Sequence, residues 1–460
     1  TYRGKDAGRR ILVLGAGRSS TSLIKYFLEH SVKQDWTVYV GDADENLARE
    51  KIGNNPRGVA FKLNAYDQGQ MSEEIKQSNI VISLLPQAMH QKVQEQCLSI
   101  GRNMVTASYL SPFVTSIAKE VEKKNLLFMN ECGLDPGIDH MLTMKKIDAI
   151  RRNGGVITRF ESFCGGLVDD ESVAGNPWKY KFTWNPRNVV LAGQSGCRFV
   201  QQGSLKIIPY SQVFRRIETL RVPGHGEFEG YANRDSLSYR ELYNLHDVGT
   251  LFRGTLRRPG FCGAWDVLVR LGMTNDTMKL NTELMTYRQF TNLFLPYRPQ
   301  DSVELKVAYQ MNLSLDDGGI FHRLQWLGLF DSELIGLKEA TPAQVLQQLL
   351  EQKWQFRPGV DRDMIPMLNK YEYESADSGE RRELQSSMVV FGNKEDTAMS
   401  MTVGYPAAIV AKLILNGEID RSGVAIPTTP DIYNPILQEL EDMGIEFHDR
   451  DRPIGLTVSH

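Results

Sequence analysis

The sequence has few cysteines, and none of them forms a CxxC pair. The five cysteines lie far apart, at positions 97, 132, 164, 197 and 262. This spacing argues against a disulfide framework and against a zinc cluster, so we expect no metal site and a reducing compartment. No secretory or amphipathic transit signal is recognisable near Thr1, and we therefore expect a cytoplasmic protein.

The chain also lacks an excess of charge and a long apolar run. Its 53 basic and 56 acidic residues give a net charge of −3, which argues against binding nucleic acid through bulk positive charge. The best apolar stretch, Ala407–Leu415, is interrupted by Lys412 and falls short of the roughly 18 residues of a membrane span. We expect neither nucleic acid nor membrane as a partner. A length of 460 residues predicts two or three domains.

The first part of the chain alternates short apolar runs with helical patterns. Strands are predicted at 11–14, 36–40, 59–63, 80–85, 103–107 and 126–129, and helices at 19–30, 71–77, 87–100 and 111–124. Strands that alternate with helices indicate an α/β fold with a doubly wound parallel sheet. Ligand-binding loops should then lie at the carboxyl ends of its strands.

The loop Gly15-Ala16-Gly17-Arg18-Ser19-Ser20 joins the first strand to the first helix. Gly15 permits a tight turn, and Gly17 has no Cβ, so the backbone can approach a pyrophosphate at the helix N-terminus. Ser20 takes the place of a third glycine. This context predicts a dinucleotide site, and the alternative is a glycine turn in an unrelated α/β sheet.

The choice of dinucleotide depends on the end of the second strand. Asp42 stands 27 residues after Gly15, somewhat beyond the usual spacing of about 20. A carboxylate there accepts hydrogen bonds from the ribose hydroxyls and repels a 2′-phosphate, so we favour NAD over NADP. In alternative interpretations Asp44 is the ribose ligand or a helix cap, and Arg49 is a distant 2′-phosphate partner.

Several further motifs occur in a fixed order along the chain. They are Val81–Pro86 followed by His90, Met104–Tyr109, Glu131–His140, Ser162–Gly166, Asn176-Pro177 with Tyr180–Trp184, Glu229–Ser236 and Arg253–Arg257. This ordered set resembles saccharopine dehydrogenase of the L-glutamate-forming type, over about residues 10–445. The set is far more specific than the glycine loop alone.

The resemblance implies an activity and an architecture. The family oxidises saccharopine with a nicotinamide cofactor, and the resulting imine is hydrolysed to L-glutamate and 2-aminoadipate 6-semialdehyde; the reverse reaction is biosynthetic. A homodimer is also implied. The expected parts are a Rossmann-like domain over 1–139, to which 404–460 returns, a mixed α/β substrate and dimerisation domain over 140–240 and 371–403, and a mainly helical lid over 241–370.

The same resemblance implies which residues bind the cofactor. Leu85 and Pro86 end the fourth strand and match a contact on the nicotinamide side, and Ala107 and Ser108 end the fifth. The full expected set is Gly15, Ala16, Gly17, Arg18, Asp42, Leu85, Pro86, Ala107, Ser108, Leu134, Asp135, Pro136 and Thr183.

Saccharopine carries three carboxylates, so its site needs fixed positive charge, and the planar fork of arginine suits a carboxylate. Arg234 and Arg257 match the substrate-binding positions of the family. Arg234 is alternatively a surface arginine paired with Asp235. The expected substrate-binding set is Ser108, Tyr109, Asp135, Arg234, Thr255, Leu256 and Arg257.

Three residues are candidates for the chemistry itself. Asp135 lies in a Pro-Gly turn after the sixth strand and would hold the substrate amine or the hydrolytic water; a turn-forming aspartate is the alternative. His90 matches the family and could relay protons, although a lone histidine is more often structural. Cys164 lines the expected cleft, and a plain buried cysteine is an equal alternative.

Patterns in the rest of the chain are weaker. Strands are predicted at 156–167, 205–210, 386–391 and 397–403, and helices at 239–245, 263–271, 342–353 and 406–415. Residues 280–312 look irregular, 372–383 look like an exposed connector, and the tail after Phe447 looks frayed.

Two other functions remain open at this point. One is an enzyme acting on a carboxylated polyamine, similar to carboxynorspermidine dehydrogenase. The other is a sensor that binds dinucleotide without turnover. The joint presence of Asp135, Arg234 and Arg257 favours saccharopine over both.

Overall fold

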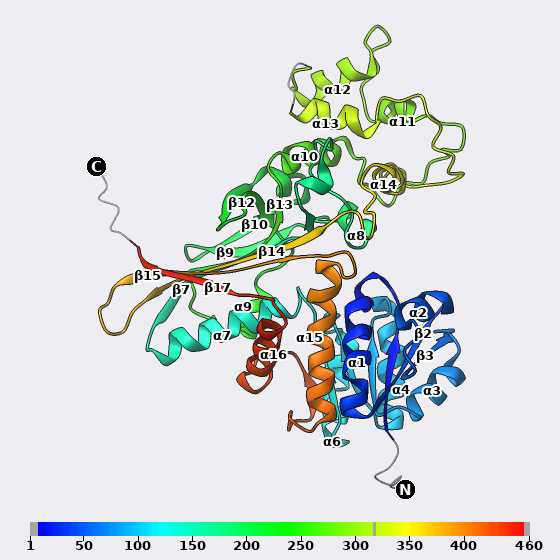
Figure 1. Ribbon diagram of the computed structural model, residues 1–460. Coiled ribbons are helices and arrows are strands. Elements are labelled where there is room, and N and C mark those ends of the chain that lie inside the picture. The colour runs from blue at the N-terminus through cyan, green and yellow to red at the C-terminus, as the bar shows by residue number, and fades with distance from the viewer. Residues whose placement is uncertain (1–7, 316–318, 455–460) are drawn as a thin grey trace. The chain divides into compact units, whose positions relative to one another are not determined.

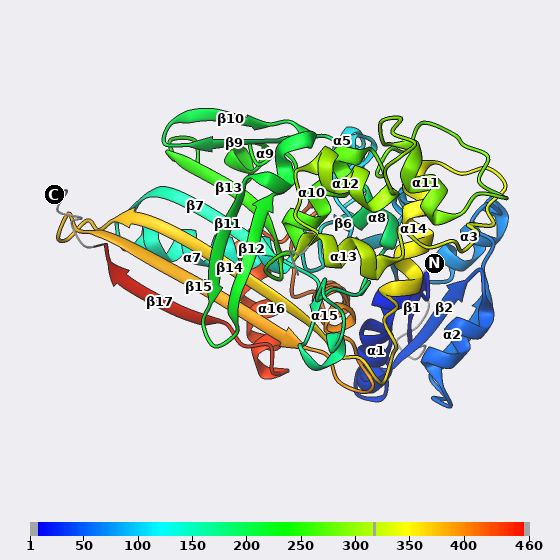
Figure 2. The same ribbon diagram turned by 90° about the horizontal axis from the view of Figure 1, so that it is seen from above.

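The computed structural model describes residues 8–315 and 319–454. The chain divides into two compact units, which Figures 1 and 2 show as ribbons. The first unit comprises Thr1–Arg152 and Glu395–Phe447, and the second comprises Asn153–Lys394 and His448–His460. Each unit is therefore built from segments that are far apart in the sequence.

The first unit contains a seven-stranded parallel sheet in the order β16-β6-β5-β4-β1-β2-β3. Its strands are β1 (Arg9–Leu14), β2 (Trp36–Asp42), β3 (Gly58–Lys62), β4 (Ile80–Ser83), β5 (Asn103–Thr106), β6 (Leu127–Met129) and β16 (Gly423–Ala425). The predicted doubly wound parallel sheet is thus confirmed. The seventh strand comes from the C-terminal return and was not predicted.

Helices follow most of these strands. They are α1 (Thr21–Gln34), α2 (Glu45–Ile52), α3 (Gln68–Lys76), α4 (Gln87–Ile100), α5 (Pro112–Ser116), α6 (Ala118–Lys123), α7 (Ile138–Arg152), α15 (Ala398–Leu415) and α16 (Pro430–Asp442). A short 3₁₀ turn, Arg18–Ser20, precedes α1. Helix α2 was not predicted, because its residues are largely charged and carry little apolar periodicity.

Helix α15 corrects two predictions. The strand predicted at 397–403 and the helix predicted to begin at Pro406 are one helix, Ala398–Leu415, with the proline inside it. Thr397 caps the helix by accepting a hydrogen bond from the Ser400 N–H at 3.0 Å, and the short apolar run before the proline could not be assigned by periodicity alone. The helix is long and apolar enough to span a membrane, contrary to our estimate from the sequence, but 61% of it is buried inside the protein.

Helix α15 packs closely along α1, as Figure 1 shows in orange and blue. A Cβ on Gly404 would lie 2.8 Å from the backbone nitrogen of Leu23, so only glycine permits this approach. The contact is extended by polar groups, because Ser400 Oγ accepts from the Ser22 N–H at 2.9 Å and Lys25 pairs with Asp396 at 2.8 Å. The return of the chain is therefore tightly joined to the first helix.

The second unit is built on a ten-stranded mixed sheet, with the path β10-β9-β13-β7-β14-β15-β17 and with β8, β11 and β12 beside it. The bounds are β7 (Val156–Cys164), β8 (Leu167–Val168), β9 (Cys197–Gln201), β10 (Ser204–Ile208), β11 (Ile217–Val222), β12 (Gly226–Ala232), β13 (Thr250–Arg257), β14 (Asp363–Glu374), β15 (Arg381–Phe391) and β17 (His448–Pro453). Figure 2 shows the long strands β14, β15 and β17 side by side.

Two predictions about this sheet were wrong. Most of the connector expected at 372–383 belongs to the β14–β15 hairpin, whose charged side chains pair across the strands, for example Arg381 with Glu372 at 3.2 Å. The tail expected to fray after Phe447 forms β17, which pairs with β15; its last residues, 455–460, lie outside the described residues. Both segments look like solvated loops because their strands carry charge rather than apolar alternation.

Helices of the second unit lie mostly between β13 and β14. They are α8 (Pro186–Val190), α9 (Ser238–Leu242), α10 (Phe261–Leu271), α11 (Tyr287–Leu293), α12 (Val303–Met311), α13 (Ile320–Leu327) and α14 (Pro342–Lys353). Helices α11 and α12 replace the irregular stretch expected at 280–312. Aromatic rings pack in the core here, as where Trp178 contacts Trp354 with ring centroids 5.3 Å apart.

The boundaries of the two units differ from those of the predicted domains. Helix α7 belongs to the first unit, the return begins at Glu395 rather than at 404, and β17 belongs to the second unit. The separate helical lid over 241–370 stays a prediction, and this range also contains strand β13.

The close approach of α15 to α1 is testable by substitution. We expect Gly404→Ala to lower the free energy of unfolding by about 1–3 kcal/mol, because the new methyl group meets rigid backbone. The matched control is Gly263→Ala in α10, where the new methyl group lies 3.4 Å from the end of Ile320 and helix propensity improves. Thermal denaturation followed by circular dichroism measures both, and equal melting temperatures would contradict the proposed contact.

Candidate active site

The glycine loop lies at the carboxyl end of β1, where the fold places ligands. Gly15 has a φ of +103°, and a Cβ there would lie 3.0 Å from the carbonyl oxygen of Leu84. Its N–H donates to the carbonyl of Gly41 at 2.8 Å. Gly17 is exposed, and a Cβ would meet nothing within 4 Å, so its missing side chain leaves room for a ligand rather than for packing.

Asp42 ends β2 and is hydrogen-bonded to this loop. Its Oδ2 accepts from the Ala16 N–H at 2.6 Å, and its Oδ1 accepts from the Asp44 N–H at 3.0 Å. These hydrogen bonds let the carboxylate hold the loop in shape when no ligand is bound. The carboxylate oxygens still have free lone pairs that can accept hydrogen bonds from a ribose. Asp44 is the N-cap of α2, and Arg49 pairs with Glu45, so both are engaged elsewhere.

Lys51 is a residue of the loop that the sequence did not reveal. Its Nζ donates to the carbonyl of Gly17 and to Ser20 Oγ, the latter at 2.9 Å. Ser20 in turn donates to the same carbonyl at 2.8 Å. Burial lowers the pKa of Lys51 to about 8, although Asp42 and Glu50 act in the opposite direction. The lysine reaches the loop from α2, and no sequence motif marks it.

His90 links the ends of two neighbouring strands. Its Nδ1 lies 2.9 Å from Ser83 Oγ at the end of β4, and its Nε2 lies 2.7 Å from Ser108 Oγ after β5. Burial lowers the pKa of His90 to about 4, so the ring is neutral at pH 7. A neutral ring with both nitrogens engaged orients the Ser108 hydroxyl. At the same edge of the sheet, Leu85 is partly exposed and Pro86 is exposed.

A buried pair supports the segments after β5 and β6. Glu131 has a φ of 58°, its Oε1 accepts from the Leu110 N–H at 2.9 Å, and its Oε2 lies 2.7 Å from His140 Nε2. The Glu131 N–H also donates to the carbonyl of Ser108 at 3.0 Å. In the sequence Glu131 stands out only as part of a motif, and its role in joining the two strand ends emerges from the structure.

Asp135 lies in the turn after β6, beside Tyr109. The Tyr109 hydroxyl is 3.4 Å from Asp135 Oδ1, and Asp135 is partly exposed, whereas Leu134 and Pro136 are buried. The turn is closed by Gly137, where a Cβ would lie 1.9 Å from the carbonyl oxygen of Gly133. Ser108, Tyr109 and Asp135 are thus brought to one edge of the sheet, and Ala107 lies beside them at the end of β5.

The other predicted residues belong to the second unit, where the strand register decides their faces. Cys164 on β7 pairs with Thr255 on β13, so their side chains share one face of the sheet with Arg257. Leu256 is wholly buried on the opposite face. The substrate-binding role expected for Leu256 stays a prediction, and its side chain lies on the face opposite that of Thr255.

Arg257 is almost completely buried, with 2% exposure. Its guanidinium lies over the rings of Tyr180 at 5.0 Å and Phe261 at 5.3 Å, and Nη1 donates to the carbonyl of Leu256 at 2.9 Å. Within the described residues its Nε finds no hydrogen-bond partner, and the same holds for the buried Oγ1 of Thr183. A buried guanidinium held by aromatic rings is suited to a carboxylate ligand.

Arg234 is exposed in the turn after β12, with a φ of 50°. Its carbonyl accepts from the Arg198 N–H at 3.1 Å. Asp235, the partner proposed in the alternative interpretation, pairs with Arg198 instead.

In the described part of the chain, no group of three or more His, Cys, Asp or Glu residues is arranged to hold a metal ion.

Comparison with known proteins gives one consistent result. The model of the saccharopine dehydrogenase NADP binding domain matches residues 11–129, and that of the saccharopine dehydrogenase C-terminal domain matches residues 133–445. Saccharopine dehydrogenase [NADP(+), L-glutamate-forming] of Saccharomyces cerevisiae is 31% identical over 95% of this chain and 97% of its own length. The mitochondrial alpha-aminoadipic semialdehyde synthase of Bos taurus is 31% identical over 95% of this chain, which spans 47% of that protein.

The solved structures agree with the sequence comparisons. Apo saccharopine dehydrogenase (L-Glu forming) from Saccharomyces cerevisiae superposes with a TM-score of 0.87 and 29% identity, over 97% of this chain and all of that one. The resemblance read from the ordered motifs is therefore confirmed. The chain belongs to the L-glutamate-forming saccharopine dehydrogenase family.

Proposed function

We propose that this chain oxidises the secondary amine of saccharopine with a nicotinamide dinucleotide, in lysine metabolism. The carbon next to the amine loses a hydride, the imine takes up water, and its C–N bond breaks to give L-glutamate and 2-aminoadipate 6-semialdehyde; the reverse sequence forms saccharopine. The observation that carries the proposal is that the glycine loop and the Tyr109–Asp135 pair lie at the carboxyl edge of one sheet. The polyamine and sensor alternatives are not favoured, since the named relatives are saccharopine enzymes.

The dinucleotide, when bound, supplies the hydride acceptor. The free lone pairs of Asp42 and the open space at Gly17 suit its ribose and pyrophosphate. Ala16 and Arg18 complete the loop, and the other proposed contacts are Leu85, Pro86, Ala107, Ser108, Leu134, Asp135, Pro136 and Thr183.

Asp135 is the proposed group that handles protons. Its carboxylate, partly exposed and within reach of the Tyr109 hydroxyl, would accept a proton from the substrate amine or from the hydrolytic water. His90 is proposed as a positioning residue for Ser108, because its ring is neutral and engaged on both sides. Cys164 is proposed to line the substrate site, since no step needs a thiolate.

The substrate carboxylates need cations. We propose Arg234 and Arg257 for this role: the first is exposed in a turn, and the second is held by aromatic rings. Thr255 shares the face of Arg257 and would contact the substrate through its hydroxyl.

The groups around Asp42 bear on the choice between NAD and NADP. Its carboxylate already accepts two backbone hydrogen bonds, and Lys51 and Arg18 place positive charge on the same loop. Together with the NADP in the names of the family model and the fungal relatives, this supports NADP. We propose NADP in place of the NAD preference deduced from Asp42 alone.

Two coarser properties complete the proposal. All five cysteines are buried and lie outside disulfide bonds, which supports a reducing compartment such as the cytoplasm. We also propose a homodimer, to be tested by light scattering of the purified chain.

The activity is tested by absorbance at 340 nm with saccharopine and either dinucleotide at equal concentration. We expect reduction of both, with the larger kcat/KM for NADP, because the charge of Lys51 and Arg18 offsets Asp42. A larger kcat/KM for NAD would contradict the proposed preference for NADP and would support repulsion of a 2′-phosphate by the Asp42 carboxylate. Binding of dinucleotide without any turnover of saccharopine would overturn the proposed function.

Lys51→Met tests the lysine that holds the glycine loop. We expect the KM for the dinucleotide to rise about tenfold, since charge-assisted hydrogen bonds are lost. In the unchanged chain Lys51 loses its proton as the pH rises through about 8, so the KM should increase above that pH and should do so less in the variant. Lys33→Met, at an exposed position of α1, is the control; equal behaviour of the two variants would exclude this role.

Arg234→Met tests the exposed arginine of the proposed substrate site. Loss of a bidentate carboxylate contact should raise the KM for saccharopine by roughly 10- to 100-fold, with little change in the KM for the dinucleotide. Arg221→Met, at another exposed arginine of the same unit, should leave both constants unchanged. Steady-state kinetics at 340 nm distinguishes them, and identical KM values for saccharopine would remove Arg234 from the site.

A further inference from the structure

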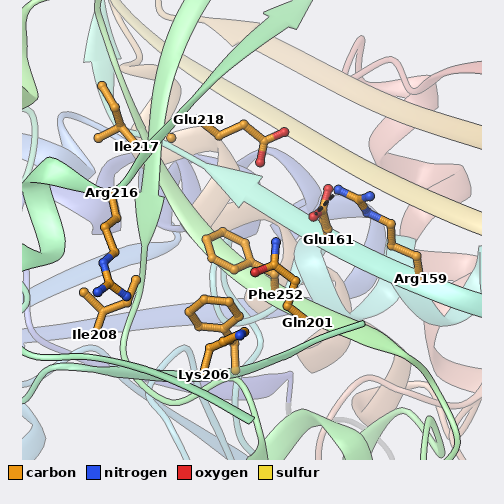
Figure 3. A pocket seen from close by; sticks show the side chains of 11 residues that line it. Arg159, Glu161, Gln201, Lys206, Ile208, Arg216, Ile217, Glu218 and Phe252 are labelled. Carbon is orange, nitrogen blue, oxygen red and sulfur yellow. Dashed lines mark hydrogen bonds and ion pairs between the residues drawn. The ribbon is translucent and has the colours of Figure 1, made fainter. Parts of the chain in front are cut away.

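A cavity of about 400 Å³ opens on the sheet of the second unit, away from the proposed substrate residues. It is lined by Arg159, Glu161, Phe199, Gln201, Lys206, Ile208, Arg216, Ile217, Glu218, Gly230 and Phe252 (Figure 3). Because Glu161 and Phe252 pair in register, their side chains share one face, and Cys164 and Thr255 lie on the other. The volume is within the range of small-molecule sites.

The floor of the cavity is apolar. The rings of Phe199 and Phe252 meet edge to face with centroids 5.0 Å apart, and Phe163 packs on Phe252 at 5.4 Å. Gly230 also lines the cavity, and a Cβ there would lie 2.6 Å from Leu220 Cδ1. Such a floor suits an aliphatic chain.

Glu161 provides a buried negative charge at one side. It is 3% exposed; its Oε1 accepts from Arg159 at 2.7 Å, but its buried Oε2 has no hydrogen-bond partner in the described structure. The nearest other cation, Lys370, is 3.9 Å away and donates to Glu218 at 3.0 Å. A buried carboxylate oxygen without a donor is costly, and an N–H group of a ligand would satisfy it.

Positive charge lies on the other side. Lys206 and Arg216 are exposed, and in the described part of the chain neither forms an ion pair with a carboxylate; Arg216 donates only to Gln212 at 2.7 Å. Figure 3 shows the Phe252 ring between Arg216 and the Arg159–Glu161 pair. The buried Oε2 of Glu161, which accepts no hydrogen bond in the described structure, and the exposed cations Lys206 and Arg216 therefore lie on opposite sides of the apolar floor.

From this arrangement we propose that the cavity binds an aliphatic molecule with a carboxylate at one end and an ammonium at the other. The carboxylate pairs with Lys206 and Arg216, the chain lies over Phe199 and Phe252, and the ammonium donates to Glu161 Oε2. An α-amino acid with an uncharged side chain carries its two charges on one carbon and cannot satisfy both ends. The site is independent of the proposed function, because its side chains face away from the proposed substrate residues.

The test is isothermal titration calorimetry of the full chain with 6-aminohexanoate. Three probes vary one feature each: hexanoate lacks the ammonium, hexylamine lacks the carboxylate, and norleucine is an isomer with adjacent charges. We expect 6-aminohexanoate to bind at least about tenfold more tightly than each of them, since each loses a charged contact.

Variants locate the binding. Lys206→Ala and Glu161→Gln should each weaken 6-aminohexanoate at least about tenfold, whereas Lys338→Ala, at an exposed lysine outside the cavity, should not. Because Glu161→Gln also disturbs Arg159, Lys206→Ala is the decisive variant. The Lys206→Ala variant should turn over saccharopine at the same rate as the unchanged chain. Absence of binding, equal binding of norleucine, or full binding by Lys206→Ala would each overturn the proposal, whatever the outcome with saccharopine.

Discussion

The carboxyl edge of the parallel sheet depends on side chains that cross from one strand end to the next. Asp42 ties the end of β2 to the loop after β1, and His90 joins the segments after β4 and β5. Glu131 then connects the segment after β5 to α7 through His140. Each of these side-chain contacts fixes a loop that has no regular secondary structure. A ligand that binds to a rigid edge loses less free energy to ordering the protein than one that binds to a mobile edge.

The second unit obeys a different constraint, the alternation of side chains along β7 and β13. Within a few residues, each strand presents Cys164 or Thr255 to one face and Glu161 or Phe252 to the other. One sheet thereby supplies the proposed substrate residues and a separate charged cavity. Mixed strand directions make this possible, because β9 and β12 flank β13 antiparallel and bring their own side chains to both faces.

Much of the first unit was predictable, because its buried parallel strands are short apolar runs and its glycine loop has a recognised form. The strands at 11–14 and 80–85 were found for this reason. The role of Lys51 was not, since it depends on the tertiary placement of a charged helix without periodicity. Helix α15 was predicted to begin at Pro406 because proline favours the first turn of a helix, whereas the proline lies inside the helix here. The order of motifs was enough to identify the family, but the face of the sheet on which the Leu256 side chain lies could be assigned only from the strand register.

The way the chain passes between the units has a consequence for its synthesis. Strand β16 (Gly423–Ala425) completes the first sheet and β17 (His448–Pro453) completes the second, so neither sheet is complete until these segments have been synthesised. During translation the strands up to β6 emerge early, yet their edge stays open and the apolar flank of α1 stays uncovered until α15 arrives. A nascent chain of this protein therefore leaves this sheet edge and the apolar flank of α1 uncovered until α15 and β16 have been synthesised.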